Sequence, residues 1–159
     1  MTALVVSDTH GDDSALRRLL NMYPHPDMLI HAGDADGSGP YYRSLVRCPV
    51  HIVTGNNDYG FFADSKETFR FAGHTIFLTH GHRYNIYRSL DSLLYAAEEA
   101  GADIVIFGHT HIPVCERQGD MLILNPGSLT YPRQAGHRPS YILLTVSDGG
   151  APDAKLLYL

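Results

Sequence analysis

Five short apolar segments recur along the chain, and each is followed within a few residues by Asp, Asn or His, usually with glycine beside it. Apolar runs of this length are typical of strands that are buried on both faces. Such strands need cover on both sides, so the chain is expected to enclose its sheets between further layers of structure. The segments are residues 4–6, 28–30, 52–53, 76–78 and 104–107.

The first third of the chain alternates these strands with helical patterns. Strands are expected at residues 3–7, 28–31 and 50–54, with helices around residues 16–20 and 42–46. Asp12 and Asp13 can cap the first helix, and Pro24 stops it. This strand–helix order predicts parallel strands that are joined by right-handed crossovers.

The second half predicts two hairpins, one long helix and further strands. The hairpins are expected at 67–79 and 114–124, the helix at 89–100, and strands at 104–107, 141–146 and 155–158. Leu90, Leu93, Leu94 and Ala97 form the apolar stripe of that helix, and Gly101 ends it. The two closing strands are expected to be antiparallel. We therefore expect an α/β chain with two sheets packed face to face and helices outside, in one domain over residues 1–159.

Composition excludes several classes of protein. The net charge of −5 leaves no basic footprint for gripping nucleic acid, although a nucleotide substrate stays open. No run approaches the ~20 apolar residues of a membrane span, and no basic segment precedes the first apolar run as in a signal peptide. Cys48 and Cys115 fit no CxxC pattern, which is typical of reduced thiols. We expect a cytoplasmic protein without a membrane partner.

The polar residues that follow the apolar runs form the candidate site. In open α/β sheets ligands bind at the carboxyl ends of the strands, and glycines there let the backbone turn and approach a ligand closely. Pairs such as Asp8 and His10, separated by one residue, point the same way in an extended segment. The residues are Asp8, His10, Asp34, Asn56, Asn57, Asp58, His80, His82, His109 and His111.

These residue types indicate a metal site. Imidazoles and carboxylates with one amide and no thiolate suit Mn, Fe, Zn or Ni better than Ca or Cu(I). A carboxylate can bridge two ions, and pairs ~3.5–4 Å apart clamp the attacking and leaving oxygens of a phosphoryl displacement. Any one Asp after a strand is more often a cap or turn residue, but independent caps do not explain five successive strand ends.

Together these blocks resemble those of the calcineurin-like metallophosphoesterases, over a span from about Leu4 to Ser128. The segment 125–128, Asn-Pro-Gly-Ser, is similar to one in the small bacterial and archaeal phosphodiesterase branch. That branch also includes the retromer subunit that serves as a scaffold. The five blocks are Asp8-x-His10, Gly33-Asp34, Gly55-Asn56-x-Asp58, His80-Gly81-His82 and Gly108-His109-x-His111.

The resemblance implies a four-layer αββα sandwich of two mixed β-sheets flanked by helices. It also implies hydrolysis of a phosphoester, above all a phosphodiester, by attack of a metal-bound hydroxide on phosphorus. We expect two divalent ions per chain, with Mn as the first choice and Fe, Ni or Zn as alternatives. By this resemblance Asp34 bridges the two ions. The first ion is held by Asp8, His10 and His111, and the second by Asn56, His80 and His109.

Asn57 departs from the common pattern of the family. Many members have His there, a general acid that the next carboxylate orients, but an amide cannot donate a proton near neutral pH. Asp58 is therefore present without the histidine that it orients in many members of the family. The missing acid argues against hydrolysis of phosphomonoesters with poor leaving groups. His82 is a substitute acid, or else a residue beside the site or on the surface. Asn57, Asp58 and His82 are the candidate catalytic residues.

Three functions remain open. The first is cleavage of a small phosphoester, with nucleotides among the candidates, and the second is a metal-binding scaffold with little catalysis. The presence of all seven predicted ligands argues against the scaffold. The third is a nuclease, which the acidic charge and short chain disfavour. A homo-oligomer stays open.

Other polar residues carry weaker signals. His31 precedes the Gly33-Asp34 turn and can support it, whereas His25, His51, His74 and His137 belong to no motif and are expected in surface or packing roles. The loop 131–136 is expected near the site, where it can contribute to substrate choice.

Overall fold

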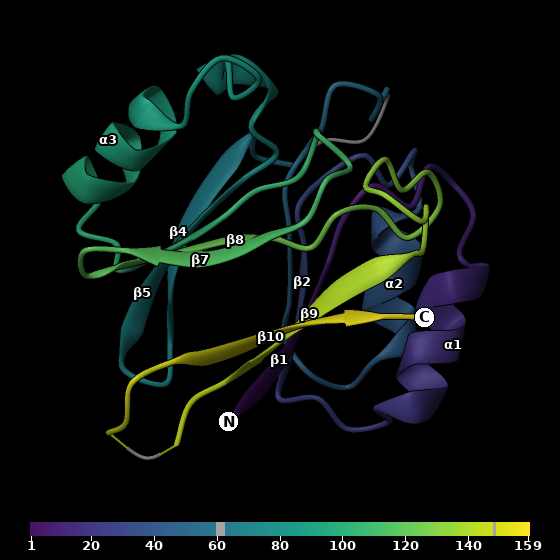
Figure 1. The fold of residues 1–159 in the computed structure, drawn as a ribbon. Helices are drawn as coiled ribbons and strands as arrows, with labels where there is room; N and C mark the ends of the chain where they lie inside the picture. The colour runs from purple at the N-terminus through teal and green to yellow at the C-terminus, as the bar shows by residue number, and fades with distance from the viewer. Residues whose placement is uncertain (60–62, 148) are drawn as a thin grey trace.

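The structure is a computed structural model, and it describes residues 1–59, 63–147 and 149–159. Within these ranges two five-stranded mixed sheets pack face to face, and helices cover their outer faces (Figure 1). This arrangement confirms the predicted αββα sandwich.

The first sheet has the strand order β10-β9-β1-β2-β3. Its first three strands along the chain are parallel, and β9 is antiparallel to both of its neighbours, as the sequence predicts. Helices α1 (Ser14–Met22) and α2 (Gly39–Leu45) pack on its outer face through Leu16, Leu19 and Tyr42. The strands are β1 (Thr2–Val6), β2 (Met28–His31), β3 (Val50–Ile52), β9 (Ser140–Thr145) and β10 (Asp153–Tyr158).

The second sheet has the order β4-β5-β6-β8-β7. The predicted hairpins β4–β5 and β7–β8 are antiparallel, while β6 runs parallel to both β5 and β8. Helix α3 (Asp91–Glu99) covers the outer face through Leu93 and Ala97. The strands are β4 (Lys66–Phe71), β5 (His74–Thr79), β6 (Ile104–Ile106), β7 (Val114–Gln118) and β8 (Met121–Asn125).

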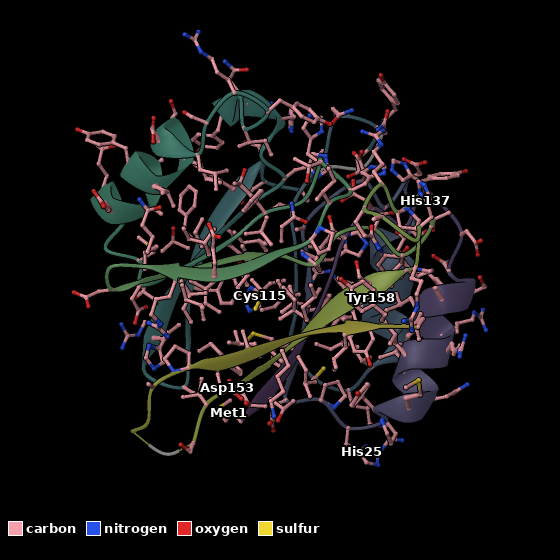
Figure 2. The ribbon with its side chains drawn as sticks, in the orientation of Figure 1. Met1, His25, Cys115, His137, Asp153 and Tyr158 are labelled. Atoms are coloured by element: carbon pink, nitrogen blue, oxygen red, sulfur yellow. The ribbon has the colours of Figure 1, made fainter. Side chains whose placement is uncertain are left out.

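Successive side chains of a strand point to opposite faces of its sheet, so each sheet contributes to two layers of the core. On β1, Ala3 and Val5 face the second sheet, whereas Leu4 and Val6 pack under the helices, as the two-residue repeat of a strand requires. The edges of the sheets also meet, because β7 contacts β10 and the Cys115 thiol lies 3.4 Å from the Ala154 carbonyl oxygen (Figure 2). The two sheets are therefore also joined along one pair of edge strands.

The structure shortens some predicted elements. Strands β3 and β6 stop at Ile52 and Ile106, before the residues that precede the polar loops, and helix α3 begins at Asp91 rather than at residue 89. A short 3₁₀ helix, η1 (His82–Tyr84), follows β5 and was not expected. In the described part of the chain no helix has both the length and the apolar character to cross a membrane.

Candidate metal centre

The loops that follow the parallel strands bring the predicted ligands together at the carboxyl ends of these strands. Several of the ligands have an uncommon backbone conformation. Asp8, His10, Asp34, His109 and His111 all have left-handed φ values, between 46° and 68°. Non-glycine residues with positive φ are uncommon, and strain of this kind gathers at functional sites. The expectation of extended Asp-x-His and His-x-His segments was therefore wrong, since tight turns aim these side chains instead.

Two glycines allow the loops to approach each other closely. A Cβ atom on Gly55 would overlap the carboxylate of Asp34, and one on Gly108 would overlap the hydroxyl of Ser7 and crowd the carboxylate of Asp8. Only glycine fits at these two positions, which agrees with the role that the sequence suggested for them.

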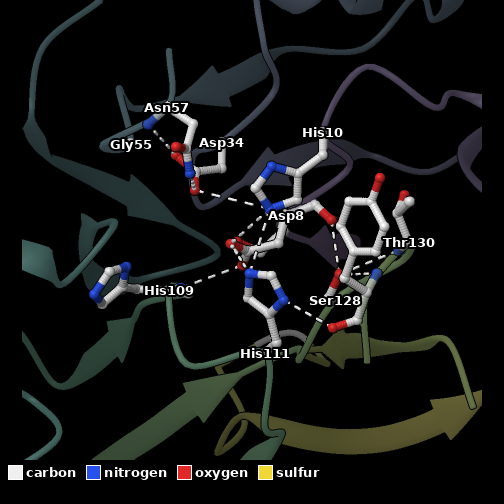
Figure 3. Close-up of polar contacts among 12 residues, drawn as sticks. Asp8, His10, Asp34, Gly55, Asn57, His109, His111, Ser128 and Thr130 are labelled. Atoms are coloured by element: carbon white, nitrogen blue, oxygen red, sulfur yellow. Dashed lines mark hydrogen bonds and ion pairs between the residues drawn. The ribbon is translucent and has the colours of Figure 1, made fainter. Parts of the chain in front are cut away.

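One group of side chains converges on Asp8. Its Oδ1 atom lies 3.1 Å from Nε2 of His111 and 3.8 Å from Nε2 of His10, and those two nitrogens are 3.3 Å apart (Figure 3). Asp8 is fully buried, and Oδ1 has no hydrogen-bond partner among the described residues. A buried carboxylate oxygen without a partner is costly, and a cation between it and the imidazoles would satisfy all three groups.

A second group consists of Asp8, Asp34 and His80, which also offer ligand atoms within reach of one ion. Nε2 of His80 lies 3.4 Å from Oδ2 of Asp34 and 3.2 Å from Oδ1 of Asn56. Asp8 belongs to both groups, while Asp34 lies between them, since its Oδ2 is also 3.8 Å from Nε2 of His10. Either carboxylate has the position of a bridge, and the assignment of that role to Asp34 stays a prediction.

His109 is set differently from the other predicted ligands. Its backbone N–H donates to Oδ2 of Asp8 over 3.2 Å, but its ring points away from the His10–His111 group (Figure 3). The ring packs edge-on against His80, with 5.0 Å between centroids. The ring of His109 therefore lies on the His80 side of the centre, whereas the ring of His111 lies on the His10 side.

Backbone carbonyls orient two of the imidazoles. Nδ1 of His80 lies 2.7 Å from the Ala32 oxygen, and Nδ1 of His111 lies 2.7 Å from the Tyr131 oxygen. A carbonyl can only accept, so each Nδ1 carries the proton and Nε2 is the atom that faces the centre. Such support on the far nitrogen is usual for histidines that bind metals.

The electrostatics of the centre favour the charged form of Asp34. Burial alone would raise the pKa of Asp34, but hydrogen bonding with His80, the charge of His80 and the two bonds from Asn57 lower it well below its usual value. Burial would lower the pKa of His80, but its bond with Asp34 and the nearby carboxylates raise it. Burial and then the charge of His80 lower the pKa of His109 to about 4, so this imidazole is neutral and can act as a ligand.

Asp58 binds backbone rather than a catalytic side chain. Its two oxygens accept hydrogen bonds of 2.7–2.8 Å from the amides of Asp34, Ala35, Asp36 and Gly55. The carboxylate thereby ties the loop after β3 to the loop after β2, and four donors leave it little capacity for another partner.

The neighbouring Asn57 contacts the carboxylate of Asp34 twice. Its backbone N–H donates to Oδ1 over 2.8 Å, and its side-chain Nδ2 donates to Oδ2 over 2.6 Å. Both contacts orient Asp34 within the centre.

His82 lies beside the centre at the start of η1. Its ring centroid is 5.4 Å from that of His80 and 6.1 Å from that of His109. Burial, followed by the charges of His80 and Arg83, lowers its pKa. Its Nδ1 atom is buried and has no partner within the described residues.

A buried chain of hydrogen bonds supports the loops from behind. The Gly33 amide donates to Nδ1 of His31 over 3.2 Å, so Nε2 of His31 carries the proton and lies 3.1 Å from the Thr9 hydroxyl. Thr9 is 2.7 Å from the Tyr42 hydroxyl, which donates to Asp13 over 2.6 Å. Burial lowers the pKa of His31 to about 4, which keeps it neutral in this chain. The sequence placed His31 here but gave no sign of Tyr42, which reads as a core residue.

The end of β8 and the segment that follows it brace the same loops from the other side. The side chain of Asn125 donates to the Gly108 carbonyl over 2.9 Å, and Ser128 and Thr130 donate 2.8 Å bonds to the carbonyls of Asp8 and Thr9. Sequence reasoning recognised the Asn-Pro-Gly-Ser segment but assigned it no task. Short polar residues that follow a buried strand were the available signal.

The remaining histidines lie away from the centre. His51 and His74 pair with Glu67 and Asp103, at 2.7 and 2.5 Å, in packing roles. His25 lies in the connection between α1 and β2, at the opposite end of the first sheet from the ligand loops (Figure 2). The exposed ring of His137 bonds the Pro132 carbonyl and stays within its own loop.

Known proteins resemble this chain over most of its length. Residues 1–149 match the model of the calcineurin-like phosphoesterase superfamily domain. The chain is 36% identical to the probable metallophosphoesterase YsnB of Bacillus subtilis, over 95% of this chain and 88% of that protein. It is 37% identical to the phosphodiesterase YfcE of Escherichia coli, over 91% of this chain and 87% of that protein.

Solved structures extend the resemblance to the fold. A predicted phosphoesterase from Streptococcus pneumoniae superposes with a TM-score of 0.85, at 28% identity, over 99% of this chain and 88% of that one. Vps29 of Entamoeba histolytica in complex with Zn²⁺ gives a TM-score of 0.79, at 26% identity, over 99% of both chains. On these matches the chain belongs to the calcineurin-like phosphoesterase superfamily, a family of metallophosphoesterase hydrolases.

Proposed function

We propose that the protein is a phosphodiesterase that depends on two divalent metal ions, with Mn as the expected metal. The observation that carries the proposal is the fully buried Oδ1 of Asp8, which faces the Nε2 atoms of His10 and His111 and accepts no hydrogen bond from the described residues. A cation is the group that such a set of acceptors best accommodates, and this donor set suits Mn, Fe, Zn or Ni. The relation to YfcE, which is named a phosphodiesterase, supports the reaction class.

In this proposal the centre binds two ions. Asp8, His10 and His111 would hold the first, and Asn56, His80 and His109 would hold the second, with Asp34 between the two sets. When bound, such a pair activates water and neutralises the charge that develops on the phosphoryl oxygens. Left-handed turns at five of these seven ligands, and buried hydrogen bonds to their loops, fix the side chains in advance, so little reorganisation is needed when a substrate arrives.

Asn57 and Asp58 have positioning roles in the proposal. Asn57 orients the Asp34 carboxylate through two hydrogen bonds, and Asp58 clamps the loops that carry Asp34 and Asn56. Neither supplies a proton to a leaving group, so diesters with good leaving groups are the favoured substrates. His82 stays the candidate for proton transfer, since it lies beside His80 and His109.

The test is turnover of bis-p-nitrophenyl phosphate by protein that has been stripped with a chelator and reconstituted with Mn. We expect hydrolysis to vanish on stripping and to return with Mn. Asp34→Asn should stay inactive after reconstitution, while an exposed control, Asp120→Asn, should match the wild type. Absence of turnover in a folded, metal-loaded protein would overturn the proposal.

The likeness to Vps29 favours a second candidate, a metal-binding scaffold with little catalysis. The same experiment separates the two functions. A scaffold binds the ions and gains stability from them but shows no metal-dependent turnover, whereas a phosphodiesterase shows both effects.

A further inference from the structure

Above the buried centre lies an exposed rim that the proposed chemistry does not use. We define the rim as Tyr87, Tyr131 and Arg133. The two tyrosines are 63% and 58% exposed, although each packs against a predicted metal ligand. Tyr131 lies 5.3 Å from His10, and Tyr87 meets His109 edge-on at 5.2 Å. The rim therefore stands beside both groups of ligands.

Arg133 is anchored through its backbone and through the guanidinium at the end of its side chain. Its backbone N–H donates to the carbonyl oxygen of His111 over 3.0 Å, and its Nη1 donates to the Tyr87 hydroxyl over 3.2 Å. That hydroxyl donates in turn to the carbonyl oxygen of His109, also over 3.2 Å. The guanidinium is thus held over the loop that carries both His109 and His111.

No carboxylate of the described residues neutralises the charge of Arg133. Among the described residues it takes part in no ion pair, and its guanidinium makes the one bond to Tyr87. A guanidinium carries five N–H donors in a planar fork that suits phosphate, so donors are left over. The backbone bond to His111 already ties this loop down, so holding the loop does not require a charged side chain.

We propose that Arg133, which Tyr87 holds in place, forms a second anion subsite, which binds a phosphate group other than the one that is cleaved. The inference rests on the proposed phosphodiesterase function and narrows its substrate class to phosphodiesters that carry a further phosphate. The metal centre would take the scissile group, and Arg133 offers a second phosphate a cation at the rim. Bidentate binding by arginine also selects for the position of that phosphate.

A matched pair of substrates tests the subsite. Thymidine 5′-(p-nitrophenyl phosphate) and its 3′-phosphorylated form share the scissile bond and differ by one phosphate. With Mn-reconstituted protein, we expect kcat/KM to be about tenfold higher for the 3′-phosphorylated form, mainly through KM, as a charge-assisted hydrogen bond supplies. Arg133→Met should remove the preference and leave the simpler substrate unaffected.

Binding provides a readout that is independent of turnover. Calorimetry should show thymidine 3′,5′-bisphosphate binding about tenfold tighter than thymidine 5′-monophosphate to wild type, but equally to Arg133→Met. Arg88→Met is the matched control, because Arg88 is also exposed and follows Tyr87 directly, and it should keep the preference. Tyr87→Phe, which removes only the hydroxyl that holds the guanidinium, should reduce the preference in part.

The outcomes separate the two proposals. If wild type cleaves the simpler diester but shows no preference in turnover or binding, the subsite is overturned and the phosphodiesterase stands. A preference that survives in Arg133→Met also overturns the subsite. If neither diester is cleaved, the phosphodiesterase fails, and the calorimetry alone then decides whether the rim binds a second phosphate.

Discussion

The metal centre has a buried base, which consists of the predicted metal ligands and their loops, and an exposed rim. The structure holds these two regions in different ways. Residues of the base, such as Asp8, Asp34 and His80, are at most 1% exposed, and their loops are bound by buried hydrogen bonds on two sides. At the rim, Tyr87 and Tyr131 are more than half exposed. The Tyr87 hydroxyl bonds the His109 carbonyl, and the Tyr131 backbone bonds His111 and Ser128, while both rings face solvent on one side. The base has the rigidity that metal chemistry needs, whereas the rim is free to meet a substrate.

This contrast predicts that the base and the rim have different roles in the reaction. Changes in the base should affect metal binding and all substrates together, because every reaction depends on the same ions. Changes in the rim should affect some substrates and leave the ions in place. Within the base and at its border with the rim, the expected effects are graded, with the largest at Asp34 and the smallest at Asn57.

The largest loss is expected for Asp34→Asn. The substitution removes charge from both groups of ligands, so kcat/KM for bis-p-nitrophenyl phosphate should fall by more than about 10²-fold, beyond the ~10–100-fold typical of residues that only support ligands. His82→Ala, beside the base, should cost much less. Steady-state kinetics on both folded proteins makes the comparison, and equal losses would show that His82 has been misassigned.

Asp58→Asn should destabilise the base itself. An amide cannot accept four backbone N–H groups and adds donors of its own, so the free energy of unfolding should fall by about 3 kcal/mol. Urea denaturation followed by circular dichroism measures the change, with the exposed Asp120→Asn as control. Wild-type stability in Asp58→Asn would mean that the clamp is not what holds these loops together.

Tyr42→Phe tests whether the buried hydrogen-bond chain sets the geometry of the ligands. The substitution leaves Thr9 without its acceptor and should weaken Mn binding by about 10–100-fold, the usual range for residues that support metal ligands. Tyr141→Phe is the matched control, since Tyr141 is also buried but bonds Tyr23, far from the centre. Calorimetric titration measures the Mn affinity of both variants. Equal affinities would show that the buried hydrogen bonds of Tyr42 do not set the geometry of the ligands.

The smallest effect is expected for Asn57→His, at the border between base and rim. A supplied general acid helps alkoxide leaving groups, where such catalysis is typically worth ~10²–10⁴-fold, but does little for nitrophenolate. We expect only several-fold narrowing of the preference for nitrophenyl esters over alkyl esters, because Asp58 is occupied by backbone amides and cannot orient the new imidazole well. An unchanged preference in a variant with full metal content would place the missing acid elsewhere, at His82 or in the substrate.

The same contrast explains what could be predicted from the sequence. The layers, the strand pairing and the convergence of the ligands follow from apolar runs that end in Asp, Asn or His, because burial and strand alternation are local properties of the sequence. The left-handed turns at Asp8 and His109 were missed, since the sequence shows no glycine there and tertiary contacts impose the conformation.

Hydrogen bonds between segments that are distant in the sequence were the second feature that could not be predicted. Asp58 keeps the position of a residue that orients an acid, yet the structure gives it four backbone amides of two loops. Tyr42 and Arg133 acquire their roles only because distant segments fold beside them, at Thr9 and Tyr87. No spacing within a single segment could have indicated these contacts.

The most direct test of the central claim is to locate the metal ions. Crystals of the Mn-reconstituted protein, measured at the Mn absorption edge, should show two anomalous peaks per chain, one near Asp8, His10 and His111 and one near His80 and Asn56. Asp34 should lie between the two peaks. A single peak, no peak, or peaks away from these side chains after saturating reconstitution would contradict the account of a two-metal centre.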